Sequence, residues 1–236
     1  MAPIYFDENA TATPHKFAIE QACSWLMGPP VNASSVHSLG RKARGAVELS
    51  RRHIAQALSV SPRHLTFTSG ATESIHTIIG STVKPGEHVL VSSVEHPAVW
   101  GALAKAEAHV EIIPVDGYGR VNPQEFTDRL RPDTRLAIMM AAQNEIGTLY
   151  PVKTIAQALG HVPLLVDAVQ AFGKVELKLE ETGATYAVLS GHKIGAPQGV
   201  GLIWSQGGTP FQSLFKGGAQ ERGRRAGTEN IAAIVG

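Results

Sequence analysis

Short apolar runs alternate with amphipathic segments along nearly the whole chain. Runs rich in valine, isoleucine and leucine predict buried strands at residues 65–68, 88–92, 110–114, 136–141, 164–166, 184–189 and 200–204. Apolar residues at helical spacing predict helices at 18–27, 38–58, 97–108 and 152–159, one that follows 69–73 and ends near Ile79, and one that opens at Asn122. This alternation is typical of an α/β fold, and we expect a three-layer sandwich in which helices cover both faces of a mostly parallel mixed sheet.

The last seven residues, Asn230 to Gly236, have the composition of an apolar helix. A helix of so few residues is only marginally stable by itself. We therefore expect either a partner that covers this segment or further chain that follows it.

Composition narrows the class of protein. The chain has 236 residues, enough for one sizeable core or for one domain and part of another. Its 21 basic and 20 acidic side chains nearly balance, so we expect neither a nucleic-acid nor a membrane partner. We find no signal-peptide pattern and no apolar run close to the roughly 20 residues that span a bilayer. Cys23 is the single cysteine, which excludes an internal disulfide and fits a cytoplasmic protein.

Two polar residues at strand ends indicate the chemistry. Asp167 directly follows the apolar run 164–166, and Lys193 lies just beyond the run 184–189. The carboxyl ends of parallel strands meet at one edge of an α/β sheet, where such folds bind ligands. A partly desolvated lysine has a lowered pKa and can form a Schiff base with an aldehyde, and a carboxylate can pair with a pyridine nitrogen. The pair suggests a pyridoxal 5'-phosphate site; a solvated lysine and a turn-capping aspartate are the alternatives.

Two segments have the composition of anion-binding sites. Residues 69–73 combine a glycine, a helix start with free N–H groups and the hydroxyl of Thr72, which suits a phosphate. An ordinary capped helix start has the same composition. Residues 217–230 form a glycine-rich loop with three arginines, which can pair with anionic groups or lie in solvent.

Other polar residues follow the predicted strands. His96 can stack on a planar ring or carry protons, and Asn144 can bind a ring oxygen or a carboxylate. A histidine at a turn and a polar loop are the alternatives. Gln170 could donate a hydrogen bond to a phenolic oxygen, and Ser190 and His192 could reach a phosphate.

Taken together, these segments resemble the cysteine desulfurase family, within the class-V aminotransferase group of fold-type-I pyridoxal-phosphate enzymes. The similarity extends nearly from end to end of the chain. The matching motifs are, in family order, residues 7–11, 32–37, 68–74, 95–97, 144–148, 166–170, 190–193 and 218–230.

The resemblance implies a role for each candidate residue. Lys193 would carry the cofactor, Asp167 would pair with its pyridine nitrogen, and His96 would stack on the ring and transfer protons. The remaining cofactor contacts would come from Ala71, Thr72, Ser190 and His192 at the phosphate, Gln170 at the ring oxygen, Asn144 near that oxygen and the substrate, and Thr228 at the phosphate of a neighbouring subunit. The family's reaction removes sulfur from L-cysteine as an enzyme persulfide and leaves alanine, so the resemblance implies L-cysteine as substrate, a homodimer and a sulfur-acceptor protein.

The sequence also departs from the family pattern. Cys23 lies in an early helical stretch and matches no catalytic cysteine, so we expect a small buried or half-buried apolar side chain there. We expect an N-terminal arm at 1–15, a cofactor-binding large domain at 16–228 and the start of an interdomain helix at 229–236, without a C-terminal small domain. Smaller departures are Gln143, Ala33, Ala219 and Ala226, in place of asparagine, proline, glycine and serine.

Three functions remain open at this point. The chain can be the large domain of a cysteine desulfurase, inactive by itself. It can be a non-enzymatic truncated paralogue that dimerises with a full-length desulfurase. It can also have another class-V activity, such as that of a selenocysteine lyase.

Overall fold

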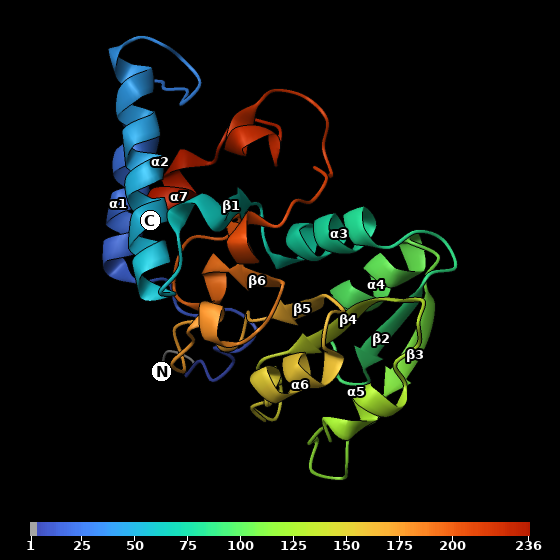
Figure 1. The fold of residues 1–236 in the computed structure, drawn as a ribbon. Coiled ribbons are helices and arrows are strands. Elements are labelled where there is room, and N and C mark those ends of the chain that lie inside the picture. Colours follow the sequence, from blue (N-terminus) through green and yellow to red (C-terminus); the bar gives the residue numbers. More distant parts are fainter. Residues whose placement is uncertain (1–3) are drawn as a thin grey trace.

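Seven strands form one mixed sheet at the centre of the computed structural model, which describes residues 4–236 (Figure 1). The strands are β1 (Leu65–Thr68), β2 (His88–Ser92), β3 (His109–Ile113), β4 (Thr134–Met140), β5 (Leu164–Asp167), β6 (Tyr186–Ser190) and β7 (Gly201–Ser205). Their order is β1-β7-β6-β5-β4-β2-β3. Only β7 is antiparallel to its neighbours, β1 and β6. The mostly parallel mixed sheet is therefore confirmed.

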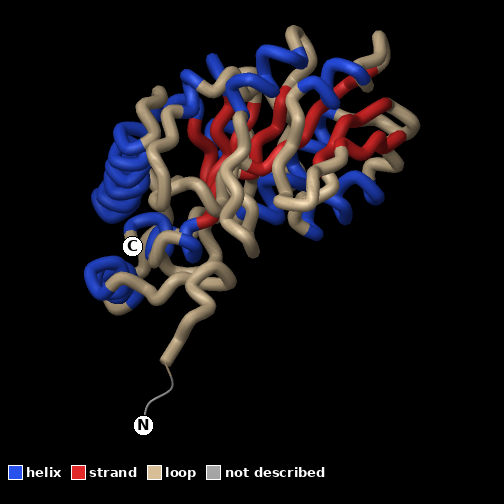
Figure 2. Tube along the Cα trace, turned by 90° about the horizontal axis from the view of Figure 1, so that it is seen from below, coloured by secondary structure: helices blue, strands red, loops and turns tan. Residues whose placement is uncertain are grey.

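Helices pack on both faces of the sheet (Figure 2). They are α1 (Lys16–Leu26), α2 (Ser38–Ala57), α3 (Ala71–Thr82), α4 (Pro97–Lys105), α5 (Gln124–Asp128), α6 (Val152–Leu159) and α7 (Ile231–Val235). Side chains alternate along each strand, so Val89 and Val91 of β2 pack with α3 and α4, whereas Leu90 faces the core that includes α2, α5 and α6. The three-layer sandwich follows from this alternation.

The predicted elements agree with the structure except at some ends. The helix predicted to reach residue 108 ends at Lys105, because Glu107 has a positive φ of 52° that no α-helix accommodates. Two polar residues predicted to follow strands belong to them instead: Asp167 is the last residue of β5, and Ser190 is the last residue of β6.

The apolar C-terminal segment is covered from within the chain. Asn230 caps α7 by accepting a hydrogen bond from the N–H of Ala233. The helix packs against α1 and α2, and four of its five residues are buried. The expected partner is therefore not needed to bury it, since the two long helices already do so. Its role as the start of an interdomain helix stays a prediction.

Cys23 is exposed, which contradicts the buried or half-buried position expected for it. The buried face of α1 is formed by Ala18 and Ala22, one helical turn apart. The next residue along the helix points about 100° away from that face, because an α-helix has 3.6 residues per turn.

The expected N-terminal arm lies against the sheet end where β6 finishes. Residues 1–3 of the expected 1–15 lie outside the described part of the chain. Within the arm, residues 7–12, which we call the strap, pass beside His192, and the N–H of Ala12 donates to the His192 carbonyl at 2.9 Å. Among residues 4–236, no helix is long and apolar enough to cross a membrane.

A glycine contact brings the start of α3 against β7. A Cβ atom built on Gly201 would lie 2.5 Å from the Cα of Gly70, the residue that precedes α3. Such a distance is far below van der Waals contact, and the atoms of Gly70 that the added Cβ would meet are backbone atoms, which cannot rotate away. Only glycine at position 201 lets the helix start approach the sheet this closely.

We predict that Gly201→Ala lowers the free energy of unfolding by about 2 kcal/mol, because the added methyl group overpacks a backbone contact. Gly45→Ala is the matched control: position 45 lies within α2, where an added Cβ meets nothing within 4 Å. This control should be neutral or stabilise by up to about 1 kcal/mol. Urea unfolding of the two variants measures the difference, and equal stabilities would contradict the close approach.

Candidate active site

A cavity of about 800 Å³ opens where β1, β4, β5 and β6 end and β7 begins. These strand ends share one edge because β1, β4, β5 and β6 all point the same way. Nine of the ten predicted site residues line this cavity: Ala71, Thr72, His96, Asn144, Asp167, Gln170, Ser190, His192 and Lys193. Thr228 lies outside it, in an adjoining hollow of about 240 Å³.

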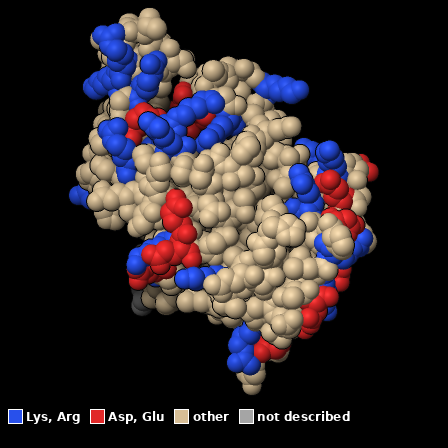
Figure 3. Space-filling view, in the orientation of Figure 1, with Lys and Arg blue, Asp and Glu red and all other residues tan. Residues whose placement is uncertain are grey.

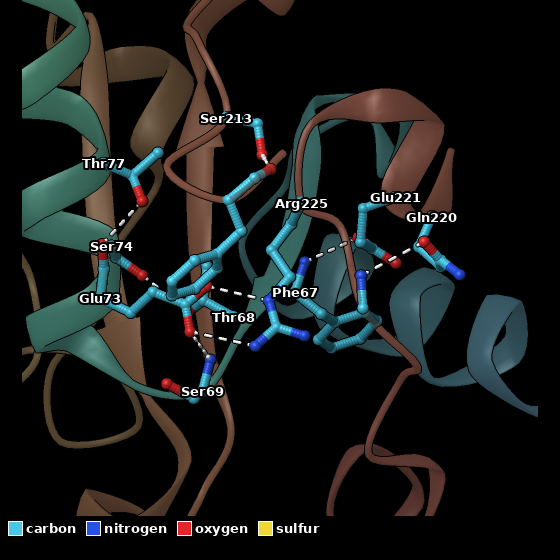
Figure 4. A network of polar contacts seen from close by, with 12 residues as sticks. Phe67, Thr68, Ser69, Glu73, Ser74, Thr77, Ser213, Gln220, Glu221 and Arg225 are labelled. Carbon is cyan, nitrogen blue, oxygen red and sulfur yellow. Dashed lines mark hydrogen bonds and ion pairs between the residues drawn. The ribbon is translucent and has the colours of Figure 1, made fainter. Parts of the chain in front are cut away.

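The first turn of α3 forms one wall of the cavity. Its N–H groups have no partner within the helix, and Ala71 and Thr72 line the cavity there. Glu73 in the same turn accepts hydrogen bonds from Arg225 at 2.9 Å and from the N–H of Ser69 at 2.9 Å (Figure 4). Burial alone would raise the pKa of Glu73, but these contacts lower it. The arginine offsets the negative charge, so the helix start still favours an anion.

Asp167 lies buried at the end of β5, with 7% of its surface exposed. Its Oδ1 accepts one hydrogen bond, from the N–H of Val169 at 3.0 Å, and no other donor among residues 4–236 reaches the carboxylate. Burial raises the pKa of Asp167, opposed by that N–H and by the charges of His96 and Lys193. A buried carboxylate with so few partners favours a cationic ligand.

Lys193 lies half-buried in the short turn that follows β6. Its Nζ donates to the carbonyls of Asn9 at 2.6 Å and Ala10 at 2.8 Å, both in the strap. Burial lowers the pKa of Lys193, and the charge of Lys174 lowers it further, whereas Asp167 and Asp7 oppose the shift. A lysine with a lowered pKa has a larger share of nucleophilic free amine.

Two histidines present imidazole groups to the cavity. His192 contacts the hydroxyl of Thr11 at 2.7 Å through Nδ1, and burial together with the charge of Lys193 lowers its pKa, which favours the neutral ring. His96 caps α4, and its Nδ1 accepts from the N–H of Ala98 at 3.1 Å. A neutral His96 therefore carries its proton on Nε2, which is free to exchange it.

Side-chain amides complete the lining. The Gln143 Oε1 accepts from the N–H groups of Glu145 at 2.5 Å and Ile146 at 2.8 Å, so it closes the turn that presents Asn144. A glutamine can thus occupy the position where the family has asparagine. Gln170 donates through Nε2 to the carbonyl of Asn9 at 2.9 Å.

Comparison with known protein families shows which family this chain is related to. The model of the aminotransferase class-V family matches residues 4–236. The chain belongs to the class-V aminotransferase family.

Cysteine desulfurases are among the relatives of this chain. It is 39% identical to cysteine desulfurase IscS 1 of Archaeoglobus fulgidus, over 98% of this chain and 63% of the relative. It is 41% identical to a cysteine desulfurase of Bradyrhizobium diazoefficiens, over 100% of this chain and 62% of the relative. The chain thus spans a little over three fifths of the length of these relatives.

Solved structures have the same fold. A NifS-like protein superposes with a TM-score of 0.94 at 35% identity, covering 98% of this chain and 67% of that one. SspA in complex with cysteine superposes with a TM-score of 0.94 at 29% identity, covering 99% of this chain and 70% of that one. The fold-type-I architecture expected from the sequence is therefore confirmed.

Thr228 belongs to a basic loop held by a buried ion pair. Glu221 accepts from Arg51 Nη2 at 2.7 Å and from the N–H of Phe67 at 2.7 Å, and both Arg51 and Glu221 are buried. Basic side chains gather over α2 and this loop (Figure 3). Thr228 itself is exposed. Its predicted contact with a neighbouring subunit stays a prediction, and its place outside the main cavity is compatible with it.

Glu95 is a buried acid of the 95–97 motif, for which the sequence predicted no role. Its Oε1 accepts from the hydroxyl of Ser92 at 2.6 Å and from the N–H of Met140 at 2.7 Å, which ties the ends of β2 and β4 together. Its Oε2 has no partner among the described residues. Burial raises the pKa of Glu95 to about 8, and the charge of Asp167 adds to this shift. The acid next to His96 is therefore neutral at pH 7.

We predict that Glu95→Gln makes the protein less sensitive to rising pH. The folded-state pKa of about 8 lies above the ordinary 4.5, so the folded protein binds this proton more tightly than the unfolded chain. The wild-type free energy of unfolding then falls between about pH 4.5 and pH 8, by roughly 4 kcal/mol from this group. Glutamine keeps the acceptor oxygen and removes the titration.

Urea unfolding at pH 5 and pH 8.5 measures this effect. The difference in stability between wild type and variant should change by that amount in favour of the variant at the higher pH. A constant difference would show that Glu95 is ionised in the folded protein.

Proposed function

We propose that this chain binds pyridoxal 5'-phosphate through Lys193 and forms the cofactor-binding part of a cysteine desulfurase that acts on L-cysteine. One observation supports this most strongly. The buried carboxylate of Asp167, which accepts a single hydrogen bond among the described residues, lines the same cavity as the half-buried amine of Lys193. L-cysteine is supported by the names of the relatives and by the similarity to SspA, a protein solved with cysteine.

The residues of the cavity fit this cofactor. Its volume of about 800 Å³ is in the range of cofactor sites. The first turn of α3 offers N–H groups and Thr72 to a phosphate, and Asp167 would hold a proton on a ring nitrogen. When bound, pyridoxal phosphate supplies an electron sink for negative charge at the α-carbon of an amino acid.

The chain's own residues would then do three things. Gln170 and Asn144 would orient the ring and the substrate through their amides. His96 would exchange a proton at Nε2, since its Nδ1 is engaged by Ala98. Lys193, held at a lowered pKa, would accept and return a proton at Nζ.

Transfer of sulfur also requires a thiolate acceptor. Cys23 lies on α1 and does not line the cavity. We propose that the acceptor is another thiol, that the whole protein acts as a cytoplasmic homodimer with Thr228 at the neighbouring phosphate, and that it passes sulfur to an acceptor protein.

We predict that Lys193→Ala abolishes covalent capture of pyridoxal 5'-phosphate. Wild type mixed with the cofactor should keep visible absorbance after gel filtration, and borohydride reduction should mark the peptide that contains Lys193. The exposed Lys153→Ala is the control and should behave as wild type. Capture at other lysines alone would overturn the proposal.

We predict that L-cysteine changes the visible spectrum of the chain loaded with pyridoxal 5'-phosphate. Release of L-alanine from cysteine, measured in parallel with the response to selenocysteine, distinguishes a desulfurase from a selenocysteine lyase and from a non-enzymatic relative. A response to selenocysteine alone would favour a lyase. A loaded chain that responds to neither would favour a non-enzymatic relative.

We predict that Asp167→Asn still captures the cofactor but slows the response to L-cysteine by at least about 100-fold, because a neutral amide no longer keeps the ring nitrogen protonated. Stopped-flow absorbance measures this rate. An unchanged rate would remove Asp167 from the proposed role.

A further inference from the structure

Lys174 lies in the turns that follow β5, and the function proposed above gives it no part. Its Nζ donates to Asn9 Oδ1 at 3.0 Å and also contacts Gln170 Oε1. The carbonyl of the same Asn9 accepts from Lys193 Nζ at 2.6 Å and from Gln170 Nε2 at 2.9 Å. Two ammonium groups and one amide thus converge on a single residue of the strap.

We infer that Lys174 is a positioning residue of this site, which orients the amide of Gln170, holds the strap through Asn9 and places a second positive charge beside Lys193. The inference rests on the proposed function, because it assigns Lys174 to the binding of the same cofactor.

The orientation of Gln170 follows from hydrogen-bond chemistry. An ammonium group has donors and no acceptor, so the amide oxygen of Gln170 must face Lys174. The amide nitrogen is then turned toward the carbonyl of Asn9, which only a donor can satisfy. Without Lys174, no contact among residues 4–236 would hold the oxygen side of the amide in place. A phenolic oxygen on the cofactor needs the donor that Lys174 keeps in place.

The hold on the strap has the same origin. The Asn9 side chain presents its oxygen to Lys174, and its carbonyl accepts from Lys193. Removing Lys174 would leave Asn9 held, within the described part of the chain, through its backbone carbonyl alone. The strap, which contacts Lys193 and His192, would then be less well fixed beside the cavity.

The charge effect is the third part of the inference. The groups facing Lys193 are Lys174, Asp167, Asp7 and the neutral His192, and Lys174 is the cation among them that lowers the pKa of Lys193 after burial itself. Burial also lowers the pKa of Lys174, opposed by the carboxylate of Glu8. Because Lys174 is exposed, water screens its charge and the effect on Lys193 is modest.

The test compares Lys174→Met with Lys174→Arg, which keeps the charge and the donors. Lys178→Met is the matched control, since Lys178 is exposed on the same stretch and pairs with Glu176 and Glu181 instead. In cofactor-free protein, the rate of reductive capture of pyridoxal 5'-phosphate at Lys193 is measured against pH by peptide mass spectrometry. Dissociation of the cofactor from the loaded chain is measured by absorbance.

In Lys174→Met, the profile of capture rate against pH should move to higher pH by about half a unit, as expected when a nearby charge screened by water is removed. It should also weaken cofactor retention about fivefold, the loss of one or two hydrogen bonds. Lys174→Arg and Lys178→Met should keep the wild-type profile. A neutral second variant, Lys174→Gln, replaces methionine if circular dichroism shows that Lys174→Met does not fold.

Two outcomes overturn the inference. One is a capture profile of the neutral variants that superimposes on wild type, which would reduce Lys174 to a structural contact. The other is a Lys174→Arg variant that behaves like the neutral ones. Failure of the proposed function looks different, since wild type itself would then show no capture at Lys193.

Discussion

Asp167 is a carboxylate that the fold withdraws from water while giving it a single backbone donor. Everything around the cavity follows from that constraint. Burial raises the pKa of nearby Glu95, and the charge of Asp167 adds to this shift, so Glu95 stays protonated. Lys193 supplies positive charge from the open side. A site with these charges is poorly satisfied when empty and favours a ligand that brings a cationic ring nitrogen to the carboxylate.

Much of the fold follows from the sequence, because buried strands are short apolar runs and the helices have an apolar stripe. Ends and exposure were harder to predict. Glu107 ends α4 through a positive φ that its residue type does not indicate. Cys23 is exposed because Ala18 and Ala22 form the buried face, a choice that depends on which neighbour α1 packs against. Such features are decided by tertiary contacts rather than by local preference.

Most of the candidate site was predictable because its residues follow strand ends within local motifs. The contacts that arrange these residues were not. Glu95 accepts a hydrogen bond from the N–H of Met140, which lies in β4. Glu73 accepts one from Arg225, which lies near the other end of the chain. Lys174 lies in a stretch with no recognisable motif, and its importance depends on the strap that crosses it. Pairings of this kind join residues far apart in sequence, and a single sequence contains no distance information.

The antiparallel strand β7 sets a dimension of the site. It lies between β1, which leads into α3, and β6, which is followed in the sheet by β5 and Asp167. The start of α3 lies against Gly201 of β7, so the helix start and the carboxylate are about two strand spacings apart, roughly 10 Å between backbones. The sheet therefore sets the length of a ligand that reaches both ends of the cavity: such a molecule carries an anionic group at the helix start and a cationic group at the carboxylate.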